Sequence, residues 1–227
     1  MRLNRYIASA NGMSRRAVDD AIAEGRLKVN GKPGLLGQNV EASDSVTLDG
    51  EPITLPVAHT YVIFNKPIGH VTSRVQQGNT PTIYALLPPE LHRLRSVGRL
   101  DRDSSGLLVL TDDGDFAFSQ THPSFQKEKR YEVGLSSTLT PAHATKLRQG
   151  VALEDGVSRL GLDDVNGRNV TVRLSEGRNR QIRRSFGALG YEVVRLHRTH
   201  FGALVLGNLQ PGEWRSFVPV TDDGDHA

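Results

Sequence analysis

Apolar residues near the N-terminus recur at helical spacing, as at Leu3, Tyr6, Ile7 and Ala10. An Asn-Gly pair at 11–12 ends this segment with a turn. Ser14 can cap a second helix over 15–24, since Gly25 follows at the position that tolerates positive φ. The pattern therefore predicts two short helices.

A strand pattern follows the helices. Residues 26–29 alternate between polar and apolar, Asn30-Gly31 is a strong hairpin turn, and residues 44–48 form a further strand. Two prolines then fall between Gly50 and His59. We therefore expect a small domain over residues 1–50 and a linker over 51–59.

The remaining chain alternates between denser apolar strands and amphipathic helices. Strands are predicted around 61–64, 107–110, 127–133, 151–153 and 169–174, and helices around 83–87, 116–118, 140–150 and 182–190. This mixture predicts an α+β domain over residues 60–220. Residues 221–227 are short and polar, and we expect a disordered tail.

The positions of the charged residues are more informative than the net charge, because the formal net charge is only +3 over 227 residues. Basic residues crowd two segments, 2–32 and 173–198, which suggests two surfaces for a polyanionic partner. The chain has no cysteine, which excludes disulfides and thiolate metal sites and suits the reducing cytoplasm. No apolar run reaches the roughly 20 residues that span a bilayer, and no histidine has metal-ligand spacing. We expect a cytoplasmic, monomeric protein with no metal, no cofactor and no membrane association.

The most informative stretch is a charged loop at 98–104 that runs into the apolar strand 107–110. A rigid strand holds the preceding loop in place, so Asp101 can keep one orientation toward a substrate. Arg99 and Arg102 are its neighbours and would keep it ionised. From spacing alone, a solvated Asp–Arg turn explains this stretch as well.

Four motifs resemble the RsuA-type pseudouridine synthases, in the family's order and over nearly the whole chain. They are Gly-Arg-Leu-Asp at 98–101 with its following Ser104 and Gly-Leu-Leu at 106–108, Asn-Lys-Pro at 65–67, Lys-x-Tyr at 129–131, and Glu-Gly-Arg-Asn-Arg-Gln at 176–181. The family more often has Thr at the position of Ser104, and the related RluA-type branch usually has His at that of Gly98. The resemblance implies a catalytic domain with a mixed, mainly antiparallel sheet and flanking helices.

The first 50 residues resemble the S4 RNA-binding domain, with Arg15-Arg16 at a helix start and Gly25 to Gly31 around the hairpin. Two arginines there add charge to backbone donors that already favour a phosphate. A basic solvated face is the alternative.

The resemblance implies roles for individual residues. Asp101 would act on the ribose, Tyr131 would stack on the uracil, and Arg183 would pair with Asp101 from a helix whose buried face carries Ile182 and Phe186. RNA contacts are expected from Arg2, Arg5, Arg15, Arg16, Lys28, Lys66, Arg99, Arg102, Lys129, Arg178, Arg180 and Arg184.

The implied reaction is the isomerisation of a uridine in ribosomal RNA, either free or in a subunit assembly intermediate. The Glu-Gly-Arg-Asn-Arg-Gln motif looks more like large-subunit members, and a small-subunit target is the alternative. Two rivals come from other classes. One is a non-catalytic S4-type RNA-binding protein, and the other is a glycoside or nucleoside hydrolase using Asp101 and Asp103, whose i, i+2 spacing is poor for flanking one bond.

Overall fold

The computed structural model describes residues 1–55, 58–76 and 78–219. The predicted disordered tail, 221–227, lies outside the described residues. The chain divides into two compact units. Unit 1 comprises Met1–Thr60 with the short segments Arg93–Arg95 and Thr111–Gly114, and unit 2 comprises the remainder.

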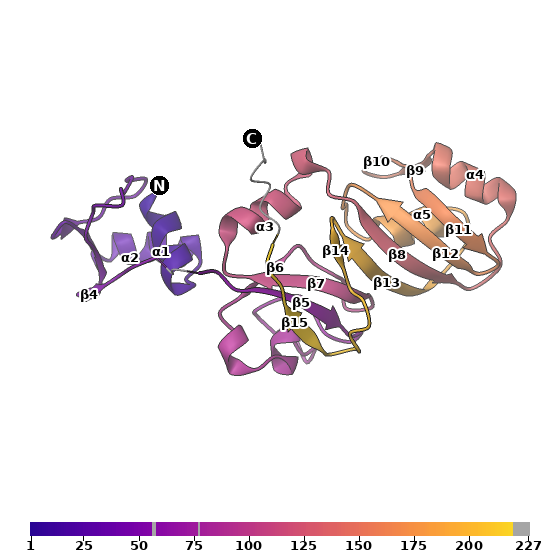
Figure 1. The fold of residues 1–227 in the computed structure, drawn as a ribbon. Coiled ribbons are helices and arrows are strands. Elements are labelled where there is room, and N and C mark those ends of the chain that lie inside the picture. The colour runs from indigo at the N-terminus through magenta and orange to yellow at the C-terminus, as the bar shows by residue number, and fades with distance from the viewer. Residues whose placement is uncertain (56–57, 77, 220–227) are drawn as a thin grey trace, which may run out of the picture. The chain divides into compact units, whose positions relative to one another are not determined.

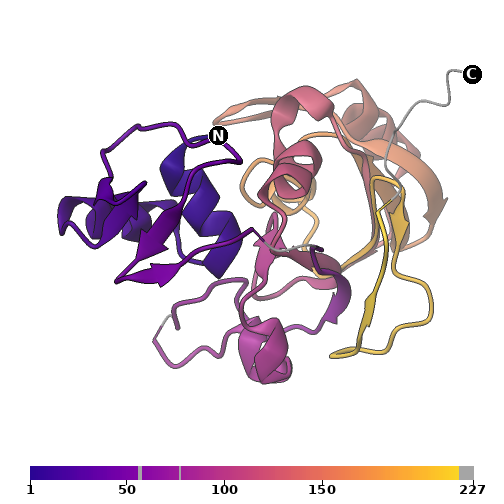
Figure 2. The ribbon, with the colours of Figure 1, turned by 60° about the vertical axis from the view of Figure 1, so that its left-hand side comes forward.

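Unit 1 begins with the two predicted helices, α1 (Leu3–Asn11) and α2 (Arg15–Ala23). Helix α1 ends at Gly12, whose φ of 77° is left-handed. Helix α2 starts at Ser14, whose side chain accepts a hydrogen bond from the backbone N–H of Ala17. Figure 2 shows these helices beside the short strands of the same unit.

The strands of unit 1 form a small sheet in the order β2-β1-β3-β4. Its members are β1 (Leu27–Val29), β2 (Lys32–Pro33), β3 (Val46–Leu48) and β4 (Glu51–Pro52). The predicted turn joins β1 to β2 with φ of 51° at Asn30 and 77° at Gly31, the conformation that a tight hairpin requires. Strand β4 pairs with β3, so the segment predicted as a linker starts inside this sheet.

Unit 2 is built on a mixed sheet with the order β11-β12-β8-β13-β7-β5-β15 (Figure 1). Strand β14 pairs with β13 and β6 pairs with β7, outside this path. Strands β13 and β7 are parallel, whereas β13 with β8, β8 with β12 and β12 with β11 are antiparallel. The strands are β5 (Tyr61–Lys66), β6 (Arg95–Val97), β7 (Ser105–Thr111), β8 (Lys129–Leu135), β11 (Gly161–Asn166), β12 (Asn169–Leu174), β13 (Val193–Phe201), β14 (Leu204–Val205) and β15 (Trp214–Ser216).

Three α-helices accompany this sheet, together with a separate hairpin of β9 (Val151–Leu153) and β10 (Gly156–Ser158). They are α3 (Gly114–Thr121), α4 (Pro141–Gln149) and α5 (Gln181–Gly187), and short 3-10 helices lie at Ile83–Leu86, Pro89–Leu91 and Pro123–Phe125. Helix α4 starts at the predicted cap, where the Thr140 hydroxyl accepts from the N–H of His143. Helix α5 buries Ile182 and Phe186, which confirms the apolar face predicted for it.

The centre of the sheet is buried on both sides. Residues Leu107 to Leu110 of β7 and Val62 to Phe64 of β5 are at most 1% exposed. Gly106 is required beside them, because a Cβ there would lie 2.2 Å from the backbone oxygen of Arg198 in β13. The close approach fixes the loop before β7 against the neighbouring strand. Within the described residues, none of the helices has the length and apolar character needed to cross a membrane.

Candidate active site

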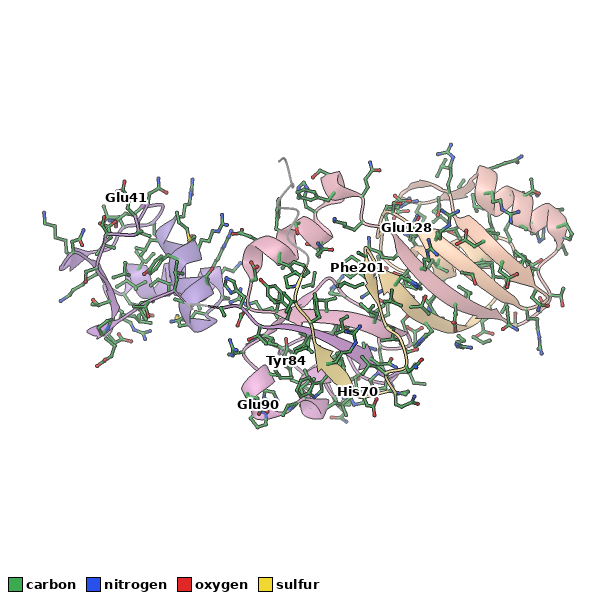
Figure 3. All side chains as sticks on the ribbon, viewed as in Figure 1. Glu41, His70, Tyr84, Glu90, Glu128 and Phe201 are labelled. Carbon is green, nitrogen blue, oxygen red and sulfur yellow. The ribbon has the colours of Figure 1, made fainter. Side chains whose placement is uncertain are left out.

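A cavity of about 780 Å³ opens at one end of the unit 2 sheet. Several separate segments line it, among them the loop before β7, the end of α3 with the loop that follows it, the start of β8, the loop from β12 into α5, and the end of β13. Figure 3 shows Glu128 and Phe201 from two of these segments, at the neighbouring ends of β8 and β13. Asp101 and Tyr131 both line this cavity, which brings two of the predicted catalytic residues together.

The loop that carries Asp101 is held through its backbone. Gly98 supplies a φ of 72°, and the N–H of Ser104 donates to the oxygen of Asp101 at 3.1 Å. The Thr72 hydroxyl donates to the oxygen of Leu100 at 2.9 Å. The Asp101 side chain is 37% exposed, so it reaches the cavity while its own backbone is tied down.

The ammonium group of Lys66 anchors this loop through hydrogen bonds to its backbone. Its ammonium donates to the backbone oxygens of Pro67 at 3.0 Å, Asp101 at 3.0 Å and Ser104 at 2.7 Å. Burial lowers the pKa of Lys66 to about 8, although the nearby carboxylates of Asp101 and Asp103 oppose that shift. The prediction that Lys66 contacts RNA is wrong, because the residue is 0% exposed and its three donors are used inside the protein.

Arg180 forms an ion pair with Asp101, at 3.7 Å between Nη1 and Oδ2. It also donates to both carboxylate oxygens of Asp103, each at 3.0 Å. Those hydrogen bonds lower the pKa of Asp103, against a smaller opposing effect of burial. Arg180 has a φ of 47°, a left-handed conformation that costs a non-glycine residue about 1 kcal/mol. The bidentate bond to Asp103 holds it in that conformation.

Arg183 does not make the predicted ion pair with Asp101. Its Nη2 donates to the backbone oxygen of Asp103 at 2.8 Å, its Nε lies 3.3 Å from the Asp103 carboxylate, and its Nη1 donates to Val193 at 2.6 Å. It is also absent from the cavity lining. Arg183 therefore connects helix α5 to the loop and to β13. It does not pair with Asp101 because, from the first turn of α5, its side chain reaches the loop two residues beyond Asp101.

The opposite wall of the cavity carries an aromatic and cationic cluster. Tyr131 is 8% exposed and lies directly across from Arg198 in the pairing of β8 with β13. Lys129 and Arg198 both lie over the ring of Phe201, at 5.5 and 5.1 Å from its centroid. Burial lowers the pKa of Lys129, and the charge of Arg198 lowers it further. The wall thus presents an apolar ring face together with positive charge.

Two arginines predicted to face phosphates are directed into the protein. Arg178 donates to the backbone oxygens of Asp155, Gly156 and Val157, and Arg184 makes a bidentate bond to the Asp155 carboxylate at 3.0 and 2.7 Å. These bonds fasten the β9–β10 hairpin to α5. Both residues therefore have partners within the protein, and their contact with RNA phosphates stays a prediction.

The other predicted contact residues lie at the surface. Arg99 and Arg102 are exposed on the loop around Asp101. In unit 1, Arg2, Arg15, Arg16 and Lys28 are exposed and Arg5 is half-buried. Their role in RNA binding stays a prediction.

Arg198 is the residue that the sequence analysis did not select. It is a buried arginine at 2% exposure that lines the cavity. The available signal was its position two residues after Leu196, which places both on the same face of β13. In the part of the chain that the structure describes, no group of three or more His, Asp or Glu side chains converges as a metal site.

Sequence comparison identifies relatives for this arrangement. The profile described as "RNA pseudouridylate synthase" matches residues 60–188. An "Uncharacterized RNA pseudouridine synthase" of Aquifex aeolicus is 35% identical over 95% of this chain and 89% of its own. The "Ribosomal large subunit pseudouridine synthase B" of Bacillus subtilis is 34% identical over 96% of this chain and 92% of its own.

A solved structure resembles nearly the whole fold. A protein described as "Crystal structure of pseudouridylate synthase" is 33% identical, has a TM-score of 0.70, and covers 96% of both chains.

Proposed function

The chain belongs to the RNA pseudouridylate synthase family, and from this premise we propose that it isomerises a specific uridine of large-subunit ribosomal RNA to pseudouridine. The partner is ribosomal RNA, free or in a subunit assembly intermediate, and the site of action is the cytoplasm.

The observation that carries the proposal is the shared cavity of Asp101 and Tyr131. A carboxylate from the loop before β7 and an aromatic ring from β8 line one space, with the guanidinium of Arg180 beside the carboxylate. A sugar and its attached base need these two groups at once. A non-catalytic RNA-binding protein would not need a carboxylate that faces a cavity on a loop fixed by Lys66.

The reaction moves one bond within the nucleotide. The N1–C1′ bond breaks and its electron pair leaves with the uracil, the base turns while bound, and C5 joins C1′. C5 then loses its proton, N1 gains one, and nothing is hydrolysed. Asp101 serves either as the nucleophile at C1′ or as the base that removes a sugar proton to give a glycal. Both routes need its carboxylate held in place, which the backbone bonds of its loop and the nearby Arg180 guanidinium support.

Tyr131 gives the turning base a surface to stack on, and the bound nucleotide must fill the cavity closely enough to exclude water. Exclusion of water matters because a trapped sugar intermediate that met water would become an abasic site. A uridine inside a helix cannot reach this cavity, so the nucleotide must be flipped out at a cost of a few kcal/mol. Contacts of exposed arginines with the RNA backbone offset that cost.

Arg99 and Arg102 beside the cavity are the contacts nearest the flipped nucleotide, and Arg99 fills the space that the base leaves. Unit 1 supplies a second surface of the S4 type, in which Arg15 and Arg16 begin helix α2 with their side chains exposed. Backbone N–H groups at a helix start favour a phosphate, and the arginines add charge to them. We assign Arg2, Arg5 and Lys28 to the same surface.

The large subunit is favoured because the relatives from Bacillus subtilis and Pseudomonas aeruginosa, the latter 37% identical, carry large-subunit names. A small-subunit uridine is the alternative, and one experiment separates them. Pseudouridines are mapped by chemical modification and primer extension in both ribosomal RNAs, from cells with and without the gene. We expect one large-subunit site to disappear.

The role of Asp101 is tested by complementing those cells with Asp101→Asn. This variant keeps the size of the side chain and every backbone bond of the loop, so RNA affinity should stay within about threefold of the wild type. Pseudouridine should not return. Restoration of the modification by Asp101→Asn would remove Asp101 from its proposed role.

A further inference from the structure

Arg198 is a buried cation with an unused hydrogen-bond donor. The residue is 2% exposed, and its Nε donates to the backbone oxygen of Leu107 at 2.7 Å. Its Nη2 has no hydrogen-bond partner. Among the described residues, no carboxylate lies within ion-pairing distance of it. A buried guanidinium without a counter-charge lowers the stability of the fold, because no ion pair offsets the free energy lost when the group leaves water.

The position of this guanidinium is built by three strands. Arg198 lies opposite Tyr131 in β8 and opposite Gly106 in β7. Gly106 has a φ of 106°, and any side chain there would collide with the backbone of Arg198. Arg198 is therefore fixed between the strand that carries the stacking tyrosine and the strand that follows the Asp101 loop. All three residues, Arg198, Tyr131 and Asp101, line the same cavity.

The proposed reaction creates a charge that suits this donor. When the N1–C1′ bond breaks, the departing uracil carries the electron pair and becomes an anion, with its charge spread over N1 and the two carbonyl oxygens. An arginine donates a hydrogen bond to such an oxygen without giving up its proton, because guanidinium is protonated throughout the physiological pH range. In an enzyme active site, one fixed donor to a developing oxyanion typically accelerates a reaction by about 10² to 10³.

We propose that Arg198 is a catalytic residue that donates from its guanidinium to a carbonyl oxygen of the flipped uracil and stabilises the uracil anion. The inference rests on the proposed function and extends it to a residue to which the sequence analysis gave no role. No proton moves to or from Arg198. Its hydrogen bond strengthens as the base becomes anionic and weakens again once C5 has joined C1′.

Arg198→Met and Arg198→Lys test the proposal. The first removes charge and donors, and the second keeps the charge but loses the planar geometry. The control is Lys146→Met, which removes an exposed cation from helix α4, outside both basic segments. Single-turnover rates are measured on a large-subunit RNA transcript carrying uridine tritiated at C5, with RNA affinity and the unfolding transition measured in parallel.

We expect Arg198→Met to lower the single-turnover rate by about 100-fold while RNA affinity stays within about threefold. Arg198→Lys should fall between this variant and the wild type, and Lys146→Met should match the wild type. A wild-type rate in a folded Arg198→Met overturns the inference. If Arg198→Met does not fold, Arg198→Lys decides, and a loss of less than about threefold overturns it.

A second substrate distinguishes stabilisation of charge from simple packing. Fluorine at C5 withdraws electrons and makes the base a better leaving group, so cleavage of 5-fluorouridine depends less on an external donor. The rate loss of Arg198→Met should therefore be smaller for RNA containing 5-fluorouridine, followed as consumption of the fluorinated nucleotide. Equal losses on both RNAs overturn the inference. If the wild type itself forms no pseudouridine, the proposed function fails instead, so the two failures are distinguishable.

Discussion

Arg180 donates hydrogen bonds to both carboxylate oxygens of Asp103 at 3.0 Å, and its Nη1 also lies 3.7 Å from Oδ2 of Asp101. The guanidinium is thus shared between a carboxylate that fixes it and a carboxylate that faces the cavity. Asp103 acts as the anchor, because a hydrogen-bonded bidentate pair is stronger and more directional than a longer ion pair. The position of charge beside Asp101 therefore depends on a residue that does no chemistry.

Asp103→Asn should loosen that anchor. The ion pair is half-exposed on both sides, so its loss should lower the free energy of unfolding by no more than about 1 kcal/mol. The single-turnover rate should fall by about tenfold, since Arg180 is no longer oriented toward Asp101. Glu132→Gln, which removes an equally exposed surface pair with Arg195, is the control and should retain the rate. A fully active Asp103→Asn would contradict the anchoring role.

Acid titration gives an independent measure of the same pair. The hydrogen bonds from Arg180 hold the pKa of Asp103 below its ordinary value of 3.8. A carboxylate with a lowered folded-state pKa contributes stability above its unfolded pKa and loses that contribution as pH falls through the folded value. The stability difference between wild type and Asp103→Asn should therefore be constant near neutral pH and shrink below about pH 4. Urea denaturation from pH 3 to 7 tests this, and a difference that grows in acid would contradict it.

Lys66 should produce a pH dependence of the same sign, but in the alkaline range. Its folded-state pKa is about 8, below the ordinary value of 10.5. Between these values the unfolded chain binds more protons than the folded one, so the free energy of unfolding contributed by Lys66 rises as pH increases. Below pH 8 both states are protonated and the contribution is flat. Relative to Lys66→Met, wild-type stability should therefore climb between about pH 8 and 10.5.

Lys66→Met also leaves three backbone oxygens without their donor, which should cost about 1–3 kcal/mol at neutral pH. Urea denaturation at pH 7, 9 and 10 measures both effects. Arg102→Met, on the exposed face of the same loop, is the control and should show neither. Parallel stability curves for wild type and Lys66→Met would rule out titration of Lys66 in this range.

Gly106→Ala should destabilise the sheet by about 3 kcal/mol or more, since its Cβ would lie 2.2 Å from the backbone oxygen of Arg198 and its φ of 106° disfavours a side chain. Gly187→Ala is the matched control. Gly187 ends α5, and a Cβ there meets nothing within 4 Å. That substitution should be neutral or stabilise by up to about 1 kcal/mol. Thermal unfolding of both variants checks the contrast, and similar midpoints would contradict it.

Arg15→Ala combined with Arg16→Ala should weaken RNA binding and flatten its salt dependence, by about one unit of slope for each lost phosphate contact. The unfolding transition should hardly change, because both side chains are exposed. Lys146→Ala on the exposed side of α4 is the control for lost charge elsewhere. Binding to a ribosomal RNA fragment across a series of salt concentrations measures the slope, and an unchanged slope would exclude this surface.

The sequence predicted the secondary structure better than it predicted which side chains contact one another. Helices α2 and α4 start at the caps that Ser14 and Thr140 provide, because a cap is a local interaction between residues three apart. The buried face of α5 followed from the spacing of Ile182 and Phe186. The mixed sheet agrees with the fold class that the family resemblance implied.

Partner choice depended on tertiary distances that spacing does not contain. Arg183 and Arg180 lie on the same segment, yet the first turns to the backbone of Asp103 and the second to its carboxylate and to Asp101. Lys66 was expected to contact RNA, and lysine is rarely buried. The run of apolar residues in β5 was the contrary signal, since a strand buried on both faces carries its last side chain into the interior.

The grip of Lys66 on the Asp101 loop has a practical consequence. Its three acceptors are carbonyl groups of the main chain, which are common to every amino acid. Exchanging the side chain at 101 therefore leaves the scaffold standing, and an inert Asp101→Asn protein keeps the receptor shape of the wild type. Such a protein would bind its natural RNA without modifying it. RNA captured with this variant could therefore be sequenced to identify the target uridine.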